Sequence, residues 1–115
     1  MSNISVKEMK VGVIIFEDED CIFAYCPSLN LIGCGDTEQE AKESFNIVFE
    51  EYINYTIENN TLIEDLKDHG WKITGSNKRL VQPDMFELMQ KDKDFINKLN
   101  KCDFKKQNIP LLIPV

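Results

Sequence analysis

The first third of the chain has the hydrophobic pattern of β-strands. Residues 9–16 and 21–26 are rich in β-branched and aromatic side chains, and the acidic residues 17–20 separate them. Two such runs around a short polar break predict a hairpin. Because apolar residues occupy successive positions in both runs, we expect strands that are covered on both faces or central in a sheet. Pro27 lacks an N–H and should end the second strand, and residues 29–33 predict a third.

The next signal is a helix start between Gly33 and Ala41. Thr37 and Glu40 have the spacing of a capping box. In this motif the threonine hydroxyl accepts from the Glu40 N–H, and the Glu40 carboxylate accepts from the N–H of Thr37. Gly33 and Gly35 allow a tight entry, and Asp36 adds negative charge at the positive end of the helix dipole. These carboxylates would repel phosphate, so we interpret the stretch as a structural joint and not as a nucleotide site.

Residues 37–59 have the period of an amphipathic helix whose apolar stripe must pack on the sheet. The stripe consists of Ala41, Phe45, Val48, Tyr52, Ile53 and Tyr55. Thr61 and Glu64 form a second capping box, which predicts a short helix over residues 62–69 that Gly70 ends. Residues 71–74 then predict a fourth strand.

Two side chains around this short helix have predicted structural roles. Trp71, with Leu62 and Leu66, should close one end of the core, and its indole N–H should find a partner at the rim. His69 lies where a cation complements the C-terminus of a helix.

The last third of the chain changes character. Residues 80–82 predict a brief strand, and Asp84 with Glu87 forms a third capping box. The apolar residues that follow indicate one helix or two short ones, broken near residues 91–94. Residues 109–115 are strongly apolar, but their two prolines confine them to an edge strand or an extended tail.

These elements predict an α+β protein with two layers. The expected order is a three-stranded antiparallel meander, a long helix, a short helix, a fourth strand and a helical C-terminal extension. We expect one unit over residues 1–77 and a helical extension over residues 78–115. The apolar end of that extension should pack as a strand or tail on the domain or on a neighbouring subunit, which predicts a homodimer or larger assembly.

The distribution of charge along the chain restricts the kinds of partner that we expect the protein to bind. The net charge is −7, with 5 basic and 15 acidic residues in 1–77 and 8 basic and 5 acidic residues in 78–115. An acidic body argues against nucleic acid as the main partner. DNA binding by a basic tail stays open as an alternative, through Lys78, Arg79, Lys98, Lys101, Lys105 and Lys106.

Cysteines and hydropathy indicate a cytoplasmic protein. No signal-like segment is found, and the most apolar stretch, residues 11–16, is too short to cross a bilayer. The cysteines at 21, 26, 34 and 102 have no C-x-x-C spacing, and we expect them to be thiols that act as small core residues. We predict no metal and no cofactor.

The stretch from residue 11 through the long helix resembles the HicB antitoxin family. The motifs that carry the likeness are Pro27 at the end of the hairpin and the helix start G-D-T-x-x-E-A at residues 35–41. The segment between them is shorter than in the family, and the first hairpin lacks a usual glycine. The resemblance implies a partial ribonuclease H-like domain without catalytic carboxylates. It also implies a protein that neutralises a small basic HicA toxin, an mRNA-cleaving enzyme.

We therefore expect a non-catalytic protein-binding module. The predicted partner-binding residues are Glu17, Asp18, Glu19, Asp20, Ile109, Leu111, Leu112 and Ile113. Many members of the family also carry a C-terminal ribbon-helix-helix or helix-turn-helix for operator binding, and residues 79–115 match neither pattern. One alternative is therefore a solitary HicB-like interaction protein without a toxin. Another alternative is a magnesium-dependent nuclease built from Asp18, Asp20, Asp36 and Glu40.

Overall fold

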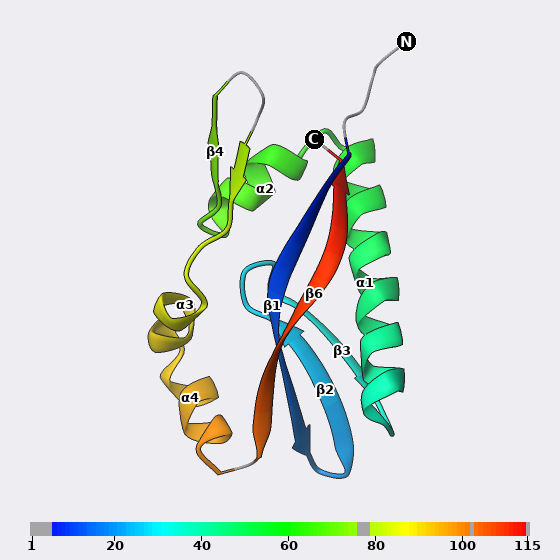
Figure 1. Cartoon of the computed structure of the whole chain (residues 1–115), viewed down its shortest axis with the longest axis vertical. Coiled ribbons are helices and arrows are strands. Elements are labelled where there is room, and N and C mark those ends of the chain that lie inside the picture. The colour runs from blue at the N-terminus through cyan, green and yellow to red at the C-terminus, as the bar shows by residue number, and fades with distance from the viewer. Residues whose placement is uncertain (1–5, 76–78, 102, 115) are drawn as a thin grey trace.

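A four-stranded antiparallel sheet forms the centre of the molecule, with strand order β3-β2-β1-β6 (Figure 1). The structure, a computed structural model, describes residues 6–75, 79–101 and 103–114. The strands are β1 (Val6–Asp18), β2 (Cys21–Cys26), β3 (Leu31–Gly35) and β6 (Phe104–Pro114). With its helices, this sheet makes the protein α+β, as predicted.

The β1–β2 hairpin turns at Glu19 and Asp20. Both residues have positive φ, 51° and 65°, which is the backbone conformation that a two-residue hairpin turn of type I′ requires. Strand β2 ends at Cys26, directly before Pro27, as predicted. Strand β3 begins at Leu31, two residues later than expected, because Asn30 adopts a left-handed conformation in the preceding turn.

Helix α1 (Glu38–Glu58) begins after Thr37. The Thr37 hydroxyl accepts the Glu40 N–H at 3.1 Å, which confirms half of the capping box. The reciprocal half is different, because the Glu40 carboxylate accepts from the N–H of Asp36 at 2.9 Å and not from Thr37. A glutamate side chain is long enough to reach one residue further, and this contact ties the end of the strand to the helix.

The buried stripe of α1 differs from the predicted stripe by one residue at two places, with Phe49 and Thr56 buried where Val48 and Tyr55 were expected. Ala41, Phe45, Phe49 and Thr56 are buried, whereas Tyr55 is 67% exposed, so its assignment to the core face was wrong. Successive helix positions are about 100° apart, so Tyr55 points well away from the buried Thr56. The core-facing stripe includes Phe49, which the predicted set omitted.

The other face of the sheet is covered as well. Helices α3 (Met85–Lys91) and α4 (Lys93–Leu99) lie on the side opposite α1 (Figure 1). A second cluster of buried residues, Ile14, Phe16 and Leu99, fills this contact. The break near residues 91–94 is confirmed, because Asp92 accepts the Phe95 N–H at 3.1 Å and starts α4. These helices form a third layer that the predicted two-layer arrangement lacks.

The predicted fourth strand exists, but it does not join the main sheet. Strand β4 (Lys72–Thr74) follows α2 (Leu62–Asp68) and forms a separate two-stranded sheet with the brief β5 (Arg79–Val81). Helix α2 begins after Thr61, but no side-chain hydrogen bond caps it, so the second capping box is wrong. The backbone of Thr61 has ψ near 3°, whereas a capping residue is normally extended.

The fourth strand of the main sheet is β6, which pairs with β1. It begins at Phe104, five residues before the predicted apolar segment, and pairs with β1 from Val6↔Pro114 to Phe16↔Phe104. It is an outer strand of the sheet, as its prolines predict. The sheet thus combines strands from both sides of the expected boundary at residue 77, and the division into two units stays a prediction.

The core beneath α1 ends at Trp71. This side chain is 2% exposed, and its indole N–H donates to the backbone carbonyl of Ser28 at 2.7 Å, which confirms the predicted rim partner. Leu62 and Leu66 are buried in the same cluster. Among the described residues, no helix is long and apolar enough to cross a membrane.

We expect Phe45→Ala to lower the free energy of unfolding by about 3–5 kcal/mol, because Phe45 is fully buried between α1 and the sheet. Ile47→Ala is the control on the same helix, since Ile47 is 57% exposed and should change stability little. Urea unfolding of both variants tests this, and equal stabilities would contradict the packing described.

Candidate functional site

The tip of the β1–β2 hairpin presents a group of carboxylates. Glu17, Glu19 and Asp20 are exposed, and Asp18 is half-buried. Asp18 forms an ion pair with Lys98 at 2.6 Å, which joins the hairpin to α4. Within the described part of the chain, the other three carboxylates form no ion pair. The tip therefore offers three solvated negative charges on a short, well-defined turn.

An apolar groove lies beside this acidic tip. Its volume is about 250 Å³, and its apolar walls come from Ile15, Phe16, Ile22 and Phe104. Phe104 is 51% exposed and pairs in register with Phe16, the residue that precedes Glu17. Protein interfaces often combine an aromatic anchor with a polar rim, and Phe104 with the charged residues around it has this combination. The hairpin tip and this groove together form the candidate site.

Glu38 is one of the charged residues that line the groove. Its carboxylate pairs with Lys105 at 2.6 Å and with Lys42 at 3.2 Å, and it accepts a hydrogen bond from the Gln107 amide at 2.9 Å. Hydrogen bonds from Lys105 and Lys42 lower the pKa of Glu38. The first turn of α1 is thereby tied to β6 at Lys105 and Gln107.

The predicted apolar partner residues fall on different faces of β6. Leu111 and Ile113 are 5% and 0% exposed and belong to the core, Ile109 is half-buried against it, and Leu112 is 62% exposed. This distribution follows from the alternation of side chains along a strand. Of the four residues, only Leu112 is available to a partner.

Phe104 is the residue that sequence reasoning missed. It precedes a polar run of Lys105, Lys106, Gln107 and Asn108, so nothing indicated a strand before residue 109. The local sequence carries no signal for Phe104 either, because single hydrophobic side chains are common on protein surfaces.

The glycine-flanked helix start is structural in this fold. A Cβ atom at Gly33 would lie 2.3 Å from the backbone nitrogen of Phe45, and one at Gly35 would lie 2.5 Å from Cβ of Glu40. No side chain fits at either position. Asp36, Thr37 and Glu40 make the capping contacts between strand and helix.

The residues of the two alternative sites come from several elements of the fold. Asp18 and Asp20 lie at the hairpin, Asp36 and Glu40 at the start of α1, and no three His, Cys, Asp or Glu side chains of the described ranges could hold a metal ion together. Of the proposed DNA-contacting residues, Lys98 and Lys105 pair with carboxylates. Arg79, Lys101 and Lys106 are exposed, and Lys78 lies outside the described residues.

The cysteines are only partly core residues. Cys26 is buried, and its thiol lies 3.3 Å from the Ser28 hydroxyl. Cys21 is half-buried, whereas Cys34 is exposed on β3, so the prediction of a core role was wrong for Cys34. Its side chain alternates away from α1 because Gly33 and Gly35 take the positions that face the helix. Cys102 lies outside the described residues.

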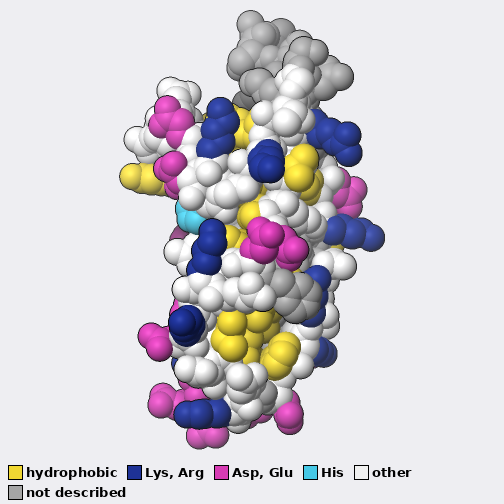
Figure 2. All heavy atoms as spheres, turned by 90° about the vertical axis from the view of Figure 1, so that its left-hand side faces the viewer, with side chains coloured by type: hydrophobic (Ala, Val, Ile, Leu, Met, Phe, Trp, Pro, Cys, Tyr) yellow, Lys and Arg dark blue, Asp and Glu magenta, His cyan; other side chains and the backbone are white. Residues whose placement is uncertain are grey.

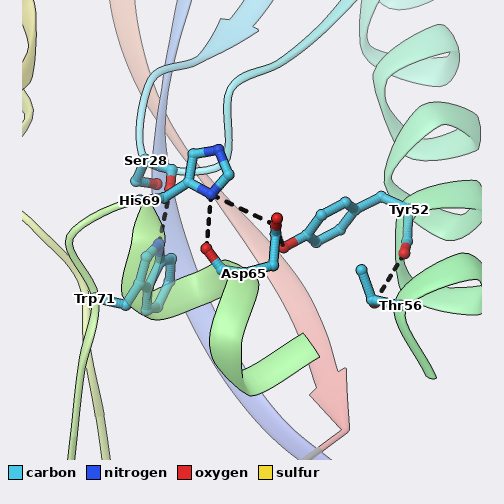
Figure 3. Close-up of polar contacts among 6 residues, drawn as sticks. All are labelled: Ser28, Tyr52, Thr56, Asp65, His69 and Trp71. Atoms are coloured by element: carbon cyan, nitrogen blue, oxygen red, sulfur yellow. Dashed lines mark hydrogen bonds and ion pairs between the residues drawn. The ribbon is translucent and has the colours of Figure 1, made fainter. Parts of the chain in front are cut away.

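A polar network joins α1 to α2 (Figure 3). The Tyr52 hydroxyl donates to the Asp65 carboxylate, and Nδ1 of His69 lies 2.7 Å from the Asp65 carbonyl oxygen and 3.4 Å from its carboxylate. Burial, the hydrogen bond to Asp65 and the charge of Asp65 raise the pKa of Tyr52. His69 ends α2, as predicted, and the network serves to hold the two helices together.

Comparison with known proteins gives no further lead. No family model, no curated protein and no solved structure matches this chain. The likeness to HicB antitoxins carried by Pro27 and residues 35–41 therefore stays a prediction.

We expect Tyr52→Phe to lower the free energy of unfolding by about 1–2 kcal/mol near neutral pH, because it leaves the half-buried Asp65 carboxylate without its hydroxyl donor. The folded-state pKa of Tyr52 lies above its ordinary value of 10.0, so its contribution is complete below about pH 10 and is lost as the pH rises further.

Denaturant unfolding at pH 8 and at increasing alkaline pH measures this effect, with Tyr55→Phe as the matched control because Tyr55 is 67% exposed. The stability difference between wild type and Tyr52→Phe should shrink above about pH 10. A difference that stays constant with pH would contradict the assignment.

Proposed function

We propose that the protein is a non-catalytic protein-binding module of the HicB antitoxin type, which neutralises a small basic mRNA-cleaving toxin. The observation that carries this proposal is the juxtaposition of the acidic hairpin tip and the apolar groove at Phe104. The family in this proposal comes from the resemblance at Pro27 and residues 35–41. The proposed setting is the cytoplasm, where cysteines remain thiols.

The two parts of the site have different roles in this proposal. The unpaired carboxylates of Glu17, Glu19 and Asp20 attract a basic surface and select it, mainly by accelerating encounter. Charge contributes less to affinity, which depends on burying an apolar anchor. Phe104 is the anchor, because it is half-exposed, aromatic and next to the acidic tip.

The partner to test is a small basic protein encoded beside this gene. Neutralising the tip with Glu17→Gln, Glu19→Gln and Asp20→Asn should slow association at low salt and reduce its dependence on ionic strength. The control removes three exposed carboxylates elsewhere, with Glu64→Gln, Glu87→Gln and Asp94→Asn. Association rates measured by surface plasmon resonance should change in the first variant and not in the second.

Phe104→Ala tests the anchor separately and should weaken binding by about 2 kcal/mol, chiefly through faster dissociation. The proposal fails if the protein purifies from its host only as a homo-oligomer and no basic protein is encoded nearby. It also fails if the tip and control variants bind such a partner equally well.

Self-association through the outer edge of β6 is a second part of the proposal. Strand β6 pairs with β1 of its own chain on one side, and its other side is the edge of the sheet. Leu112, 62% exposed, lies on this strand. The unpaired backbone N–H and C=O groups of an edge strand can pair with a second copy, and the apolar half of β6, residues 109–113, is the part suited to it.

We expect a dimeric mass by light scattering for the wild type and a shift toward monomer for Leu112→Lys, because a charge at the edge disfavours pairing. Ile47→Lys is the control, since it places the same charge at a 57% exposed position on α1. A monomeric wild type at high concentration would contradict self-association.

A further inference from the structure

A second cavity lies away from the hairpin tip, between the sheet, the end of α2 and the α3–α4 segment. Its volume is about 380 Å³, and its walls come from β2, the turn after it, residues 68–70 and the α3–α4 segment. Its lining residues come from three segments that are far apart in the sequence and adjacent in the fold. Neither Phe104 nor residues 17–20 line it.

Two aromatic rings form part of the wall. Tyr25 and Phe95 contact each other edge to face, with ring centroids 4.9 Å apart. The Tyr25 hydroxyl donates to the side-chain oxygen of Asn30 at 3.4 Å, so the polar end of the ring is directed toward the turn at the cavity wall. Aromatic rings attract cations through their negative faces.

Two carboxylates line the same cavity. Asp92 accepts the Phe95 N–H with one oxygen at 3.1 Å, which fixes the carboxylate beside that aromatic ring and leaves its second oxygen available. Asp68 is exposed at the end of α2. Over residues 6–75, 79–101 and 103–114, neither carboxylate forms an ion pair.

The cavity therefore has a negative electrostatic character. Burial raises the pKa of Tyr25, and the charge of Asp92 raises it further. Among the described residues that line the cavity, two are carboxylates, one is the ammonium of Lys91 and one is the imidazole of His69. The surface on this side carries acidic and basic side chains together, with a hydrophobic patch at the height of α3 and α4 (Figure 2).

We propose that this cavity binds the guanidinium group of an arginine side chain of a protein partner, between the rings of Tyr25 and Phe95 and the carboxylates of Asp92 and Asp68. A planar cation that hydrogen-bonds carboxylates and stacks on aromatic rings matches these walls better than a compact ammonium. The assignment of the arginine to a protein partner rests on the proposed function, whereas the cation preference of the cavity does not.

The probe is N-acetyl-arginine amide, titrated into the full chain and followed by the backbone amide NMR signals of Asn30, Gly70 and Phe95. The matched control is N-acetyl-citrulline amide, which has nearly the same shape and no charge. Citrulline should bind roughly tenfold more weakly, because it loses the attraction of both carboxylates.

Asp92→Asn is the decisive variant, because asparagine caps a helix about as well as aspartate and should leave α4 intact while removing the charge. It should weaken binding of the arginine probe by roughly two- to fivefold, as should Asp68→Asn. Asp94→Asn, two residues along and outside the cavity lining, should have no effect. Lys91→Gln should strengthen binding, because it removes a competing cation.

The inference is overturned if the arginine probe shifts none of these signals up to its solubility limit, or if citrulline binds equally well. It is also overturned if inorganic phosphate binds instead and Lys91→Gln abolishes that binding. The tip variants of Glu17, Glu19 and Asp20 should leave probe binding unchanged. If the arginine probe binds but the protein has no basic partner, the antitoxin proposal fails and the cation preference of the cavity stands.

Discussion

The backbone of α1 lies so close to β3 that no side chain fits between them at Gly33 or Gly35. This close approach fixes the distance between helix and sheet, and the other contacts of that layer follow from it. Ala41 and Phe45 reach the core at the first two turns because the helix starts against the strand. The capping contacts of Thr37 and Glu40 set the direction of the helix at the same place. The joint thus determines which residues of α1 are buried.

Strand β1 is the second determinant, because it contributes to both cores. Its odd-numbered residues Val11, Val13 and Ile15 pack under α1, while Ile14 and Phe16 pack under α4. Gly12 lies on the α4 side, where a Cβ would reach the terminal methyl of Met85. The acidic tip lies at the end of this strand, and the cavity is lined by Tyr25 of β2, which pairs with β1 in the sheet.

Local patterns predicted the elements of this fold better than their pairing. Hydrophobic runs, Pro27 and the Thr37 cap identified the hairpin and α1, because those signals act within a few residues. The place of β6 beside β1 could not be predicted, since a strand's partner is decided by packing across the whole chain. The same reason explains the site: residues 17–20 were identifiable as a charged turn, but Phe104 became part of it only through its register with Phe16. The cavity at Tyr25 and Asp92 combines residues from distant segments, so no local sequence pattern predicted it.

The pairing of β1 with β6 also has a consequence for how the chain acquires its structure. Partners in this ladder are separated by 88 to 108 positions, from Phe16↔Phe104 to Val6↔Pro114. Contacts of such large sequence separation cost loop-closure entropy before they give any stabilisation, so they slow folding. The hairpin and α1 can form from neighbouring residues, but Leu111 and Ile113 complete the core under α1 only when the final ladder closes. Until then β1 presents an unpaired apolar edge, which makes the interval before closure the period in which the chain is most exposed to aggregation.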